Sequence, residues 1–160
     1  MPDIQLNQVE FESLAAEILS AGQVLRFRAK GSSMSPFIRN GDIIEVLPGS
    51  GSSIRRGDVV LCRKLSGKLF AHRVIRTYQT GDSRKLIVQG DALSHPDGEI
   101  DSGQVLGRVI TVEHNCKKLS VDTYGQRLFA QLWITTAPVS QKTYHLLIRM
   151  KNLLGIGGRL

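Results

Sequence analysis

Apolar residues recur at helical spacing near the start of the chain. Between residues 8 and 20 they lie three or four positions apart, with Glu10, Glu12 and Glu17 among them. Gly22 follows, and glycine commonly stands just past the end of a helix. The pattern therefore predicts an amphipathic helix over residues 8–20.

Between residues 24 and 122 the pattern changes to short alternating or continuous apolar runs. These runs predict strands over residues 24–28, 42–47, 58–62, 69–75, 86–89 and 105–110. Glycine, serine and proline punctuate them, and Ser66-Gly67 is typical of a turn between two paired strands. Many short strands with such connections favour a mainly β fold, with a barrel-like antiparallel or mixed β core behind an N-terminal helix.

Helical spacing returns in the last part of the chain. Residues 127–136 and 141–154 have the pattern of two amphipathic helices, and Pro138 lies between them. We therefore divide the chain into an N-terminal helix (1–23), a β core (24–122) and a basic, amphipathic helical extension (123–160). The apolar faces of this extension either pack on the open side of the sheet or bind a membrane or a partner protein.

Charge is distributed unevenly along the chain. The net charge is +7, and residues 123–160 contain basic residues but no Asp or Glu. Such a segment is either a solvated basic face or a binding site for a polyanion, such as acidic lipid headgroups, nucleic acid or an acidic protein. Of these polyanions, nucleic acid is the one that we do not expect as a partner.

The location expected from the sequence is the cytoplasm. The N-terminus is acidic where a secretory signal is basic, and no run of about 18 apolar residues is present. Cys62 lies in an apolar run and Cys116 in a polar turn, which favours free thiols in a reducing compartment. The histidines show no metal-ligand spacing with cysteine or carboxylate, so we expect no metal and no cofactor.

Catalytic chemistry is first suggested by residues 31–36, Gly-Ser-Ser-Met-Ser-Pro, where the chain passes from a strand into a turn. Such a bend can expose the hydroxyl of Ser33 and leave backbone N–H groups free to stabilise an oxyanion. A serine nucleophile needs a base that is neutral near pH 7, and His72 in its apolar strand is the best candidate. By this pattern alone, a structural turn and a half-buried histidine remain the alternative.

An ordered set of motifs resembles type I signal peptidases over residues 24–110. The blocks are Gly31-x-Ser33-Met34-x-Pro36, Gly41-Asp42, Arg56-Gly57-Asp58-Val59-Val60, His72-Arg73-Val74-Ile75 and Gly90-Asp91. They are most similar to the branch found in archaea, the endoplasmic reticulum and some Gram-positive bacteria. That branch uses a Ser/His pair, whereas ordinary bacterial signal peptidases and the SOS repressors use Ser/Lys.

The resemblance implies a role for each matching residue. It implies that Ser33 is the nucleophile, His72 the general base and Asp97 the carboxylate that orients the histidine, with Asp91 as the alternative. Asp91 is otherwise expected to hold a turn near the site. The residues expected to shape the turn and the oxyanion site around Ser33 are Gly31, Met34 and Pro36. Since Gly31 stands where many signal peptidases have serine, the oxyanion hole would rest mainly on the backbone N–H of Ser33.

The implied function is a serine endopeptidase that cleaves a peptide or protein after small residues. The usual transmembrane anchor is missing, so the substrate is expected in the cytoplasm unless residues 123–160 attach the protein to a membrane or a partner. Two alternatives remain open. The chain resembles self-cleaving SOS repressors, for which Ala21-Gly22 would be the cleavage site, and a non-catalytic peptide-binding module could have the same fold.

Overall fold

The computed structural model describes residues 6–121. The helices expected over residues 127–136 and 141–154 lie outside the described residues. The described elements are α1 (Gln8–Ser20), β1 (Leu25–Arg28), β2 (Ile43–Pro48), β3 (Val59–Arg63), β4 (Leu69–Thr80), β5 (Ser83–Gln89), β6 (Gly98–Asp101), the 3₁₀ helix η1 (Ser102–Gln104), β7 (Val105–His114) and β8 (Lys117–Ser120).

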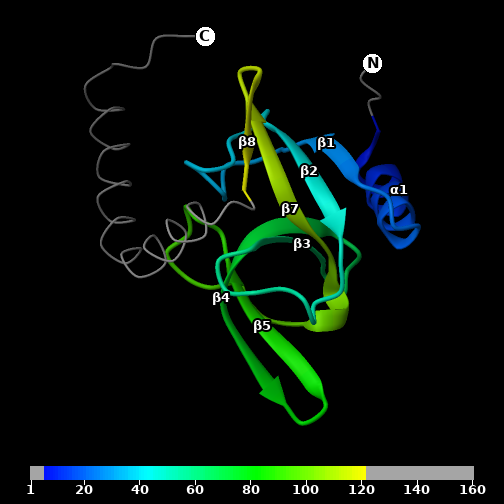
Figure 1. Ribbon diagram of the computed structural model, residues 1–160, viewed down its shortest axis with the longest axis vertical. Helices are drawn as coiled ribbons and strands as arrows, with labels where there is room; N and C mark the ends of the chain where they lie inside the picture. Colours follow the sequence, from blue (N-terminus) through cyan, green and yellow to red (C-terminus); the bar gives the residue numbers. More distant parts are fainter. Residues whose placement is uncertain (1–5, 122–160) are drawn as a thin grey trace.

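The strands form one antiparallel sheet in the order β1-β2-β7-β3-β4-β5-β6, and β8 pairs with β7 (Figure 1). The mainly β, antiparallel character predicted from the sequence is confirmed. The sheet does not close into a barrel, because β1 and β6 stand at the two ends of the strand order within residues 6–121. Irregular register occurs between Glu45 and Val46, between Leu61 and Cys62, and between Val74 and Arg76. Such bulges bend strands locally.

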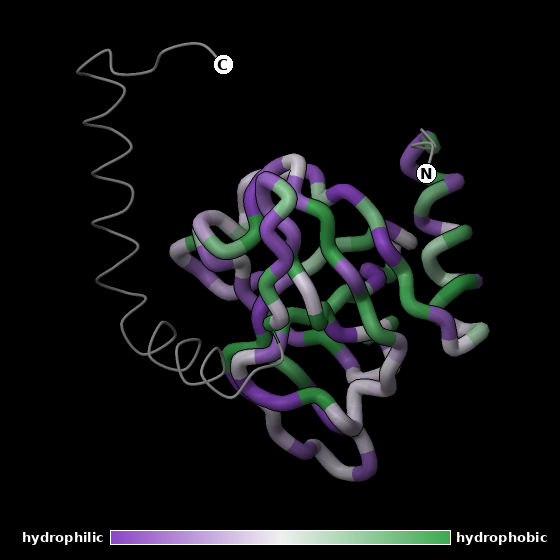
Figure 2. Tube along the Cα trace, turned by 45° about the horizontal axis from the view of Figure 1, so that its top comes forward, coloured by the Kyte–Doolittle hydropathy of each residue, from purple (hydrophilic) through white to green (hydrophobic). Residues whose placement is uncertain are grey.

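Helix α1 confirms the expectation for residues 8–20 to the residue. Its first turn is fixed by a capping box, in which Asn7 accepts from the N–H of Glu10 and the Glu10 carboxylate accepts from the N–H of Asn7. Gly22 has a φ of +77°, which favours glycine just past a helix. Phe11 packs on Phe27 of β1, with ring centroids 4.9 Å apart, so the helix lies against the sheet (Figure 2).

Two groups of buried side chains form the core. The larger lies between α1 and the strands at the β1 end of the sheet, and the smaller lies among β3, β4, β5 and β7. Fully buried members of the larger group are Ala15, Ile44, Val46, Val59 and Val109, and those of the smaller are Ile54, Val60, Cys62, Val74, Leu86 and Val88. Neighbouring residues of β3 therefore contribute to different groups, as the alternation of side chains along a strand requires.

Two turns that precede β2 and β3 have the same construction. Residues 39–42 and 55–58 both have the sequence Arg-x-Gly-Asp, and in each the aspartate accepts a hydrogen bond of 2.8 Å from the N–H of the arginine. The glycines have φ values of +92° and +96°, which glycine adopts at little cost. The second carboxylate oxygen of each aspartate faces β7, where it meets His114 and Arg108 respectively.

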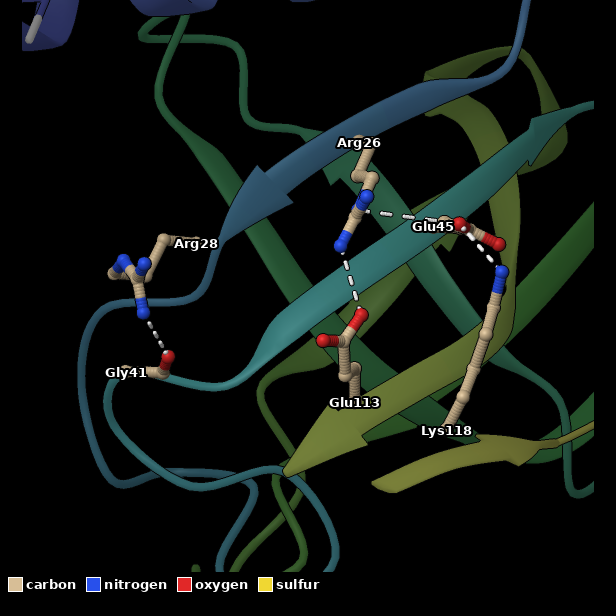
Figure 3. Close-up of polar contacts among 6 residues, drawn as sticks. All are labelled: Arg26, Arg28, Gly41, Glu45, Glu113 and Lys118. Atoms are coloured by element: carbon tan, nitrogen blue, oxygen red, sulfur yellow. Dashed lines mark hydrogen bonds and ion pairs between the residues drawn. The ribbon is translucent and has the colours of Figure 1, made fainter. Parts of the chain in front are cut away.

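Ion pairs cover the outer face of β1, β2, β7 and β8 (Figure 3). Arg26 lies 2.7 Å from Glu113, and Lys118 lies 2.8 Å from Glu45. The hydrogen bond from Lys118 lowers the pKa of the Glu45 carboxyl. Exposed pairs of this kind contribute little to stability.

Both cysteines are free, as expected from the sequence. Cys62 is buried, and this burial raises the pKa of its thiol to about 12. Cys116 is exposed at the tip of the β7–β8 hairpin, with a φ of +62°. Over residues 6–121 the structure contains no helix of the length and apolarity that crossing a membrane requires.

Candidate active site

Ser33 lies in the connection between β1 and β2. Gly31, with a φ of +100°, begins the bend, and its N–H donates to the side chain of Asn40 at 3.0 Å. Met34 is buried in the larger core group, and its carbonyl accepts from the N–H of Ile38 at 3.0 Å. The turn is therefore fixed on both sides of Ser33. The Ser35–Pro36 peptide bond within it is cis.

His72 occupies a buried position on β4. Only 7% of the residue is exposed, and its ring meets the edge of the Phe70 ring at a centroid distance of 5.3 Å. Its main chain pairs with Val60 of β3. The packing against Phe70 and the strand pairing together fix the position of the imidazole.

Three sequence-predicted residues meet at this point. The Oγ atom of Ser33 lies 3.0 Å from Nε2 of His72, and Nδ1 of His72 lies 2.5 Å from Oδ2 of Asp97. Because a carboxylate only accepts hydrogen bonds, the neutral form of the imidazole has its proton on Nδ1, and in that form Nε2 can accept the hydroxyl proton of Ser33. The Asp97 N–H donates to the carbonyl of Val88 at 2.9 Å, which fixes the loop before β6. A serine, a neutral histidine and a carboxylate in this order can activate a nucleophile.

Asp91 has a different partner from Asp97. Its two carboxylate oxygens accept hydrogen bonds from Nε and Nη2 of Arg73, at 2.8 and 2.7 Å. Burial raises the pKa of the Asp91 carboxyl, and the hydrogen bonds from Arg73 oppose this shift. Of the two carboxylates considered in the sequence, it is thus Asp97 that contacts the imidazole.

Arg73 connects several segments around the site, and sequence reasoning did not single it out. Besides its bonds to Asp91, it donates through Nη1 to the carbonyl of Gly57 at 2.9 Å. Its guanidinium lies 5.2 Å from the ring centroid of Phe37, which belongs to the turn that contains Ser33. The one signal in the sequence was its place directly after His72 in the motif block.

The turn at residues 90–93 lies directly against Ser33. The N–H of Ala92 donates to the carbonyl of Ser33 at 2.9 Å. A Cβ atom at Gly90 would lie 2.6 Å from that same carbonyl oxygen and 2.9 Å from Cδ1 of Leu93. Only glycine allows so close an approach of the two main chains.

Substitution of Gly90 by alanine should therefore move the Ser33 turn. We expect Gly90→Ala to lower the free energy of unfolding by about 1–3 kcal/mol and the reactivity of Ser33 by about 10²-fold. Gly103→Ala is the matched control, because an added Cβ there has no neighbour within 4 Å. Urea unfolding and the rate of labelling by a serine-directed probe would measure both effects. Equal results for the two variants would contradict the prediction.

A second histidine–aspartate pair differs from the first in the partner of its Nε2 atom and in its exposure. Nδ1 of His114 lies 2.6 Å from Oδ1 of Asp42, but its Nε2 faces Nη1 of Arg39 at 3.1 Å and no serine hydroxyl. The side chain of His114 is 38% exposed, whereas that of His72 is 9% exposed. This pair supplies an internal comparison for the site at Ser33.

The family model described as Peptidase S24-like matches residues 2–110, well over half of the chain. The chain belongs to the Peptidase S24-like family. The match spans the Ser33 turn, His72 and the loop that carries Asp97. It confirms the resemblance at the level of the superfamily that includes SOS repressors and signal peptidases. No curated protein matches the chain.

Proposed function

We propose that this Peptidase S24-like chain is a serine endopeptidase of the Ser/His type. The observation that carries the proposal is the contact of the Ser33 hydroxyl with His72, whose other ring nitrogen meets Asp97. We further propose, from the resemblance to signal peptidases of the Ser/His branch, that small residues flank the scissile bond of a peptide or protein substrate.

Acylation is the first half of the proposed reaction. Ser33 Oγ attacks the carbonyl carbon of the scissile peptide bond while Nε2 of His72 accepts the hydroxyl proton. The C–N bond then breaks, and His72 returns the proton to the leaving amine. In the second half, water attacks the acyl ester with His72 again as base, which releases the acid and restores the Ser33 hydroxyl. Asp97 stabilises the imidazolium that forms in each half.

A donor for the developing oxyanion is available at Ser33 itself. The main-chain N–H of Ser33 makes no hydrogen bond with any residue between 6 and 121. Its neighbours in the bend are held, since Gly31 donates to Asn40 and Ser35 donates to the carbonyl of Ser32. A fixed and unpaired N–H beside the nucleophile supports the proposed oxyanion role.

The strand that carries His72 offers an edge for an extended peptide. The register of β4 with β5 begins at Arg73, so residues 69–72 extend past the end of β5. In the part of β4 up to Val74, the main-chain groups of the even-numbered residues point toward β3, because Val74 exchanges hydrogen bonds with Gly57 and Asp58. The N–H and C=O of Ala71 therefore point the other way, and they have no partner within the described residues. Addition of a peptide strand would satisfy both groups next to His72.

Self-cleavage at Ala21-Gly22 receives less support than cleavage of a separate substrate. In the structure this peptide bond forms the C-terminal cap of α1, where the N–H of Ala21 donates to Glu17 and that of Gly22 to Leu19. A bond held in a helix cap lacks the extended backbone that strand addition requires. Intact mass after incubation would reveal any shortening at this site.

We also propose that residues 123–160, which lie outside the residues that the structure describes, contact a membrane or a partner protein. Their basic and apolar side chains would suit anionic lipid. The full chain should float with anionic liposomes, whereas a variant that lacks residues 123–160 should not. Equal flotation of the two proteins would contradict the proposal.

Labelling by a fluorophosphonate probe tests the nucleophile. The probe should modify the wild type at Ser33 and should not modify Ser33→Ala. Ser32→Ala is the matched control, because this neighbouring serine is exposed and its only hydrogen bond with residues 6–121 runs through its carbonyl. Labelling that persists in Ser33→Ala would refute the proposed function.

Replacement of Asp97 by asparagine should lower the rate of peptide cleavage by about 10⁴-fold. An amide at this position can donate to Nδ1, which would favour the tautomer with its proton on Nε2. That tautomer cannot accept the proton of Ser33. The rate should be compared with that of Asp101→Asn, a change in an exposed aspartate paired with Lys85. A similar small loss in both variants would exclude an orienting role for Asp97.

A further inference from the structure

The open edge of β4 ends at a contact with the N-terminal helix. The N–H of Leu69 donates to Oε1 of Glu12 at 3.3 Å, although the two residues are 57 positions apart in the sequence. Leu69 is the first residue of β4, and it points its main-chain groups in the same direction as Ala71, because alternate residues of a strand do so. The helix thus occupies one hydrogen-bonding position of the edge that would receive the peptide.

The spacing of Leu69 and Ala71 along β4 determines how many main-chain hydrogen bonds a peptide can form with this edge. Two residues of a strand span about 6.6–6.8 Å. A peptide that pairs with Ala71 beside His72 would therefore need Leu69 for its next hydrogen bond. The carboxylate of Glu12 already accepts from that N–H, so a peptide carbonyl would have to displace it.

Several contacts hold Glu12 in this position. The side-chain amide of Gln8 donates to the same Oε1 atom at 2.9 Å. The capping box at Asn7 and the contact of Phe11 with Phe27 fix the helix on the sheet. The Glu12 acceptor is thus held beside Leu69 before a substrate binds, so a substrate carbonyl, which must first be ordered, is the weaker competitor for Leu69.

We propose that Glu12 ends the substrate-binding edge of β4 and thereby limits the length of peptide that the protein recognises. On the side of the scissile bond that lies along β4, the extended contact stops at Ala71. Residues of the substrate beyond that point add no main-chain hydrogen bonds. This inference rests on the proposed peptidase function and makes Glu12 a specificity-determining residue.

A length series of peptides tests the limit. The probes are quenched-fluorescent peptides with alanine on both sides of the scissile bond, lengthened by one residue at a time on one side and then on the other. With the wild type, kcat/KM should rise with length and then level off. With Glu12→Ala, kcat/KM should level off only at peptides about two residues longer, and only when the peptide is lengthened on one side of the scissile bond. The longer peptides should gain about 2- to 10-fold, mostly through a lower KM.

Two further variants separate this role from a merely structural one. Glu12→Gln keeps an oxygen acceptor at the same position and should retain the wild-type plateau. Glu17→Ala removes an exposed carboxylate from the same helix and should also retain it. Peptides too short to reach Leu69 are the internal reference, and circular dichroism checks that each variant is folded.

The outcomes distinguish this inference from the proposed function. If Ser33→Ala is inactive and Glu12→Ala has the wild-type plateau, the inference is overturned and the peptidase remains. If Ser33→Ala cleaves as fast as the wild type, the proposed function itself is overturned. If the wild type cleaves no member of the series, the peptide substrate class fails, and the inference fails with it.

Discussion

His72→Ala should abolish the reactivity of Ser33 with a fluorophosphonate probe, with a loss of about 10⁴-fold or more in the rate constant of labelling. The reason is the contact of 3.0 Å between Nε2 of His72 and Oγ of Ser33. A serine hydroxyl without a base is a poor nucleophile, and no second imidazole contacts Ser33 among the described residues.

The second histidine–aspartate pair provides the control for this prediction. His114→Ala removes an imidazole that also meets an aspartate at 2.6 Å, but its Nε2 faces Arg39. We expect this variant to keep the labelling rate of the wild type within a few-fold. If His72→Ala also kept that rate, Ser33 would not depend on the imidazole, and a Ser/His mechanism would be ruled out.

The positions of Ser33 and His72 could be predicted because each lies in a short motif. The bend at residues 31–36 and the block that begins at His72 are recognised from consecutive residues, without knowledge of the fold. The helix at residues 8–20 was predicted for the same reason, since its apolar spacing and the glycine that follows it are local. The substitutions above test the roles of these residues.

Contacts between distant segments could not be predicted in this way. Spacing in the sequence left both Asp91 and Asp97 open as partners of His72. The choice depends on Arg73, which binds both oxygens of Asp91 and leaves Asp97 to meet the imidazole. The contact between Glu12 and Leu69 is likewise invisible in the sequence, because it depends on how the helix packs on the sheet.

Strands β6 and β8 were not predicted from the sequence, because few of their residues are apolar and buried. All four residues of β8 are exposed, and in β6 only Ile100 is buried. Neither strand has the alternation of apolar and polar residues from which strands are recognised. The sequence also placed the end of β4 at Ile75, whereas the strand continues to Thr80 and pairs with β5 as a long hairpin. Polar residues dominate that extension.

Asp91→Ala should cause the largest loss of stability among the substitutions considered. Arg73 and Asp91 are both 4% exposed, and two hydrogen bonds join them. Removal of one partner leaves a buried charge without compensation, which costs about 3–5 kcal/mol. Lys118→Ala is the control, because it breaks a pair with Glu45 in which the lysine side chain is 56% exposed. For Lys118→Ala, the free energy of unfolding measured in urea should fall by less than about 1 kcal/mol.

A double variant separates the stability of this pair from its effect on the site. Arg73→Met combined with Asp91→Leu replaces the buried charges with apolar side chains, which should restore much of the stability lost in Asp91→Ala. Reactivity of Ser33 should stay low, because the double variant cannot bond to Gly57 or place a guanidinium over Phe37. Recovery of both stability and labelling rate would show that the ion pair serves the core alone. Recovery of stability without labelling would assign Arg73 a positioning role for the turn that carries Ser33.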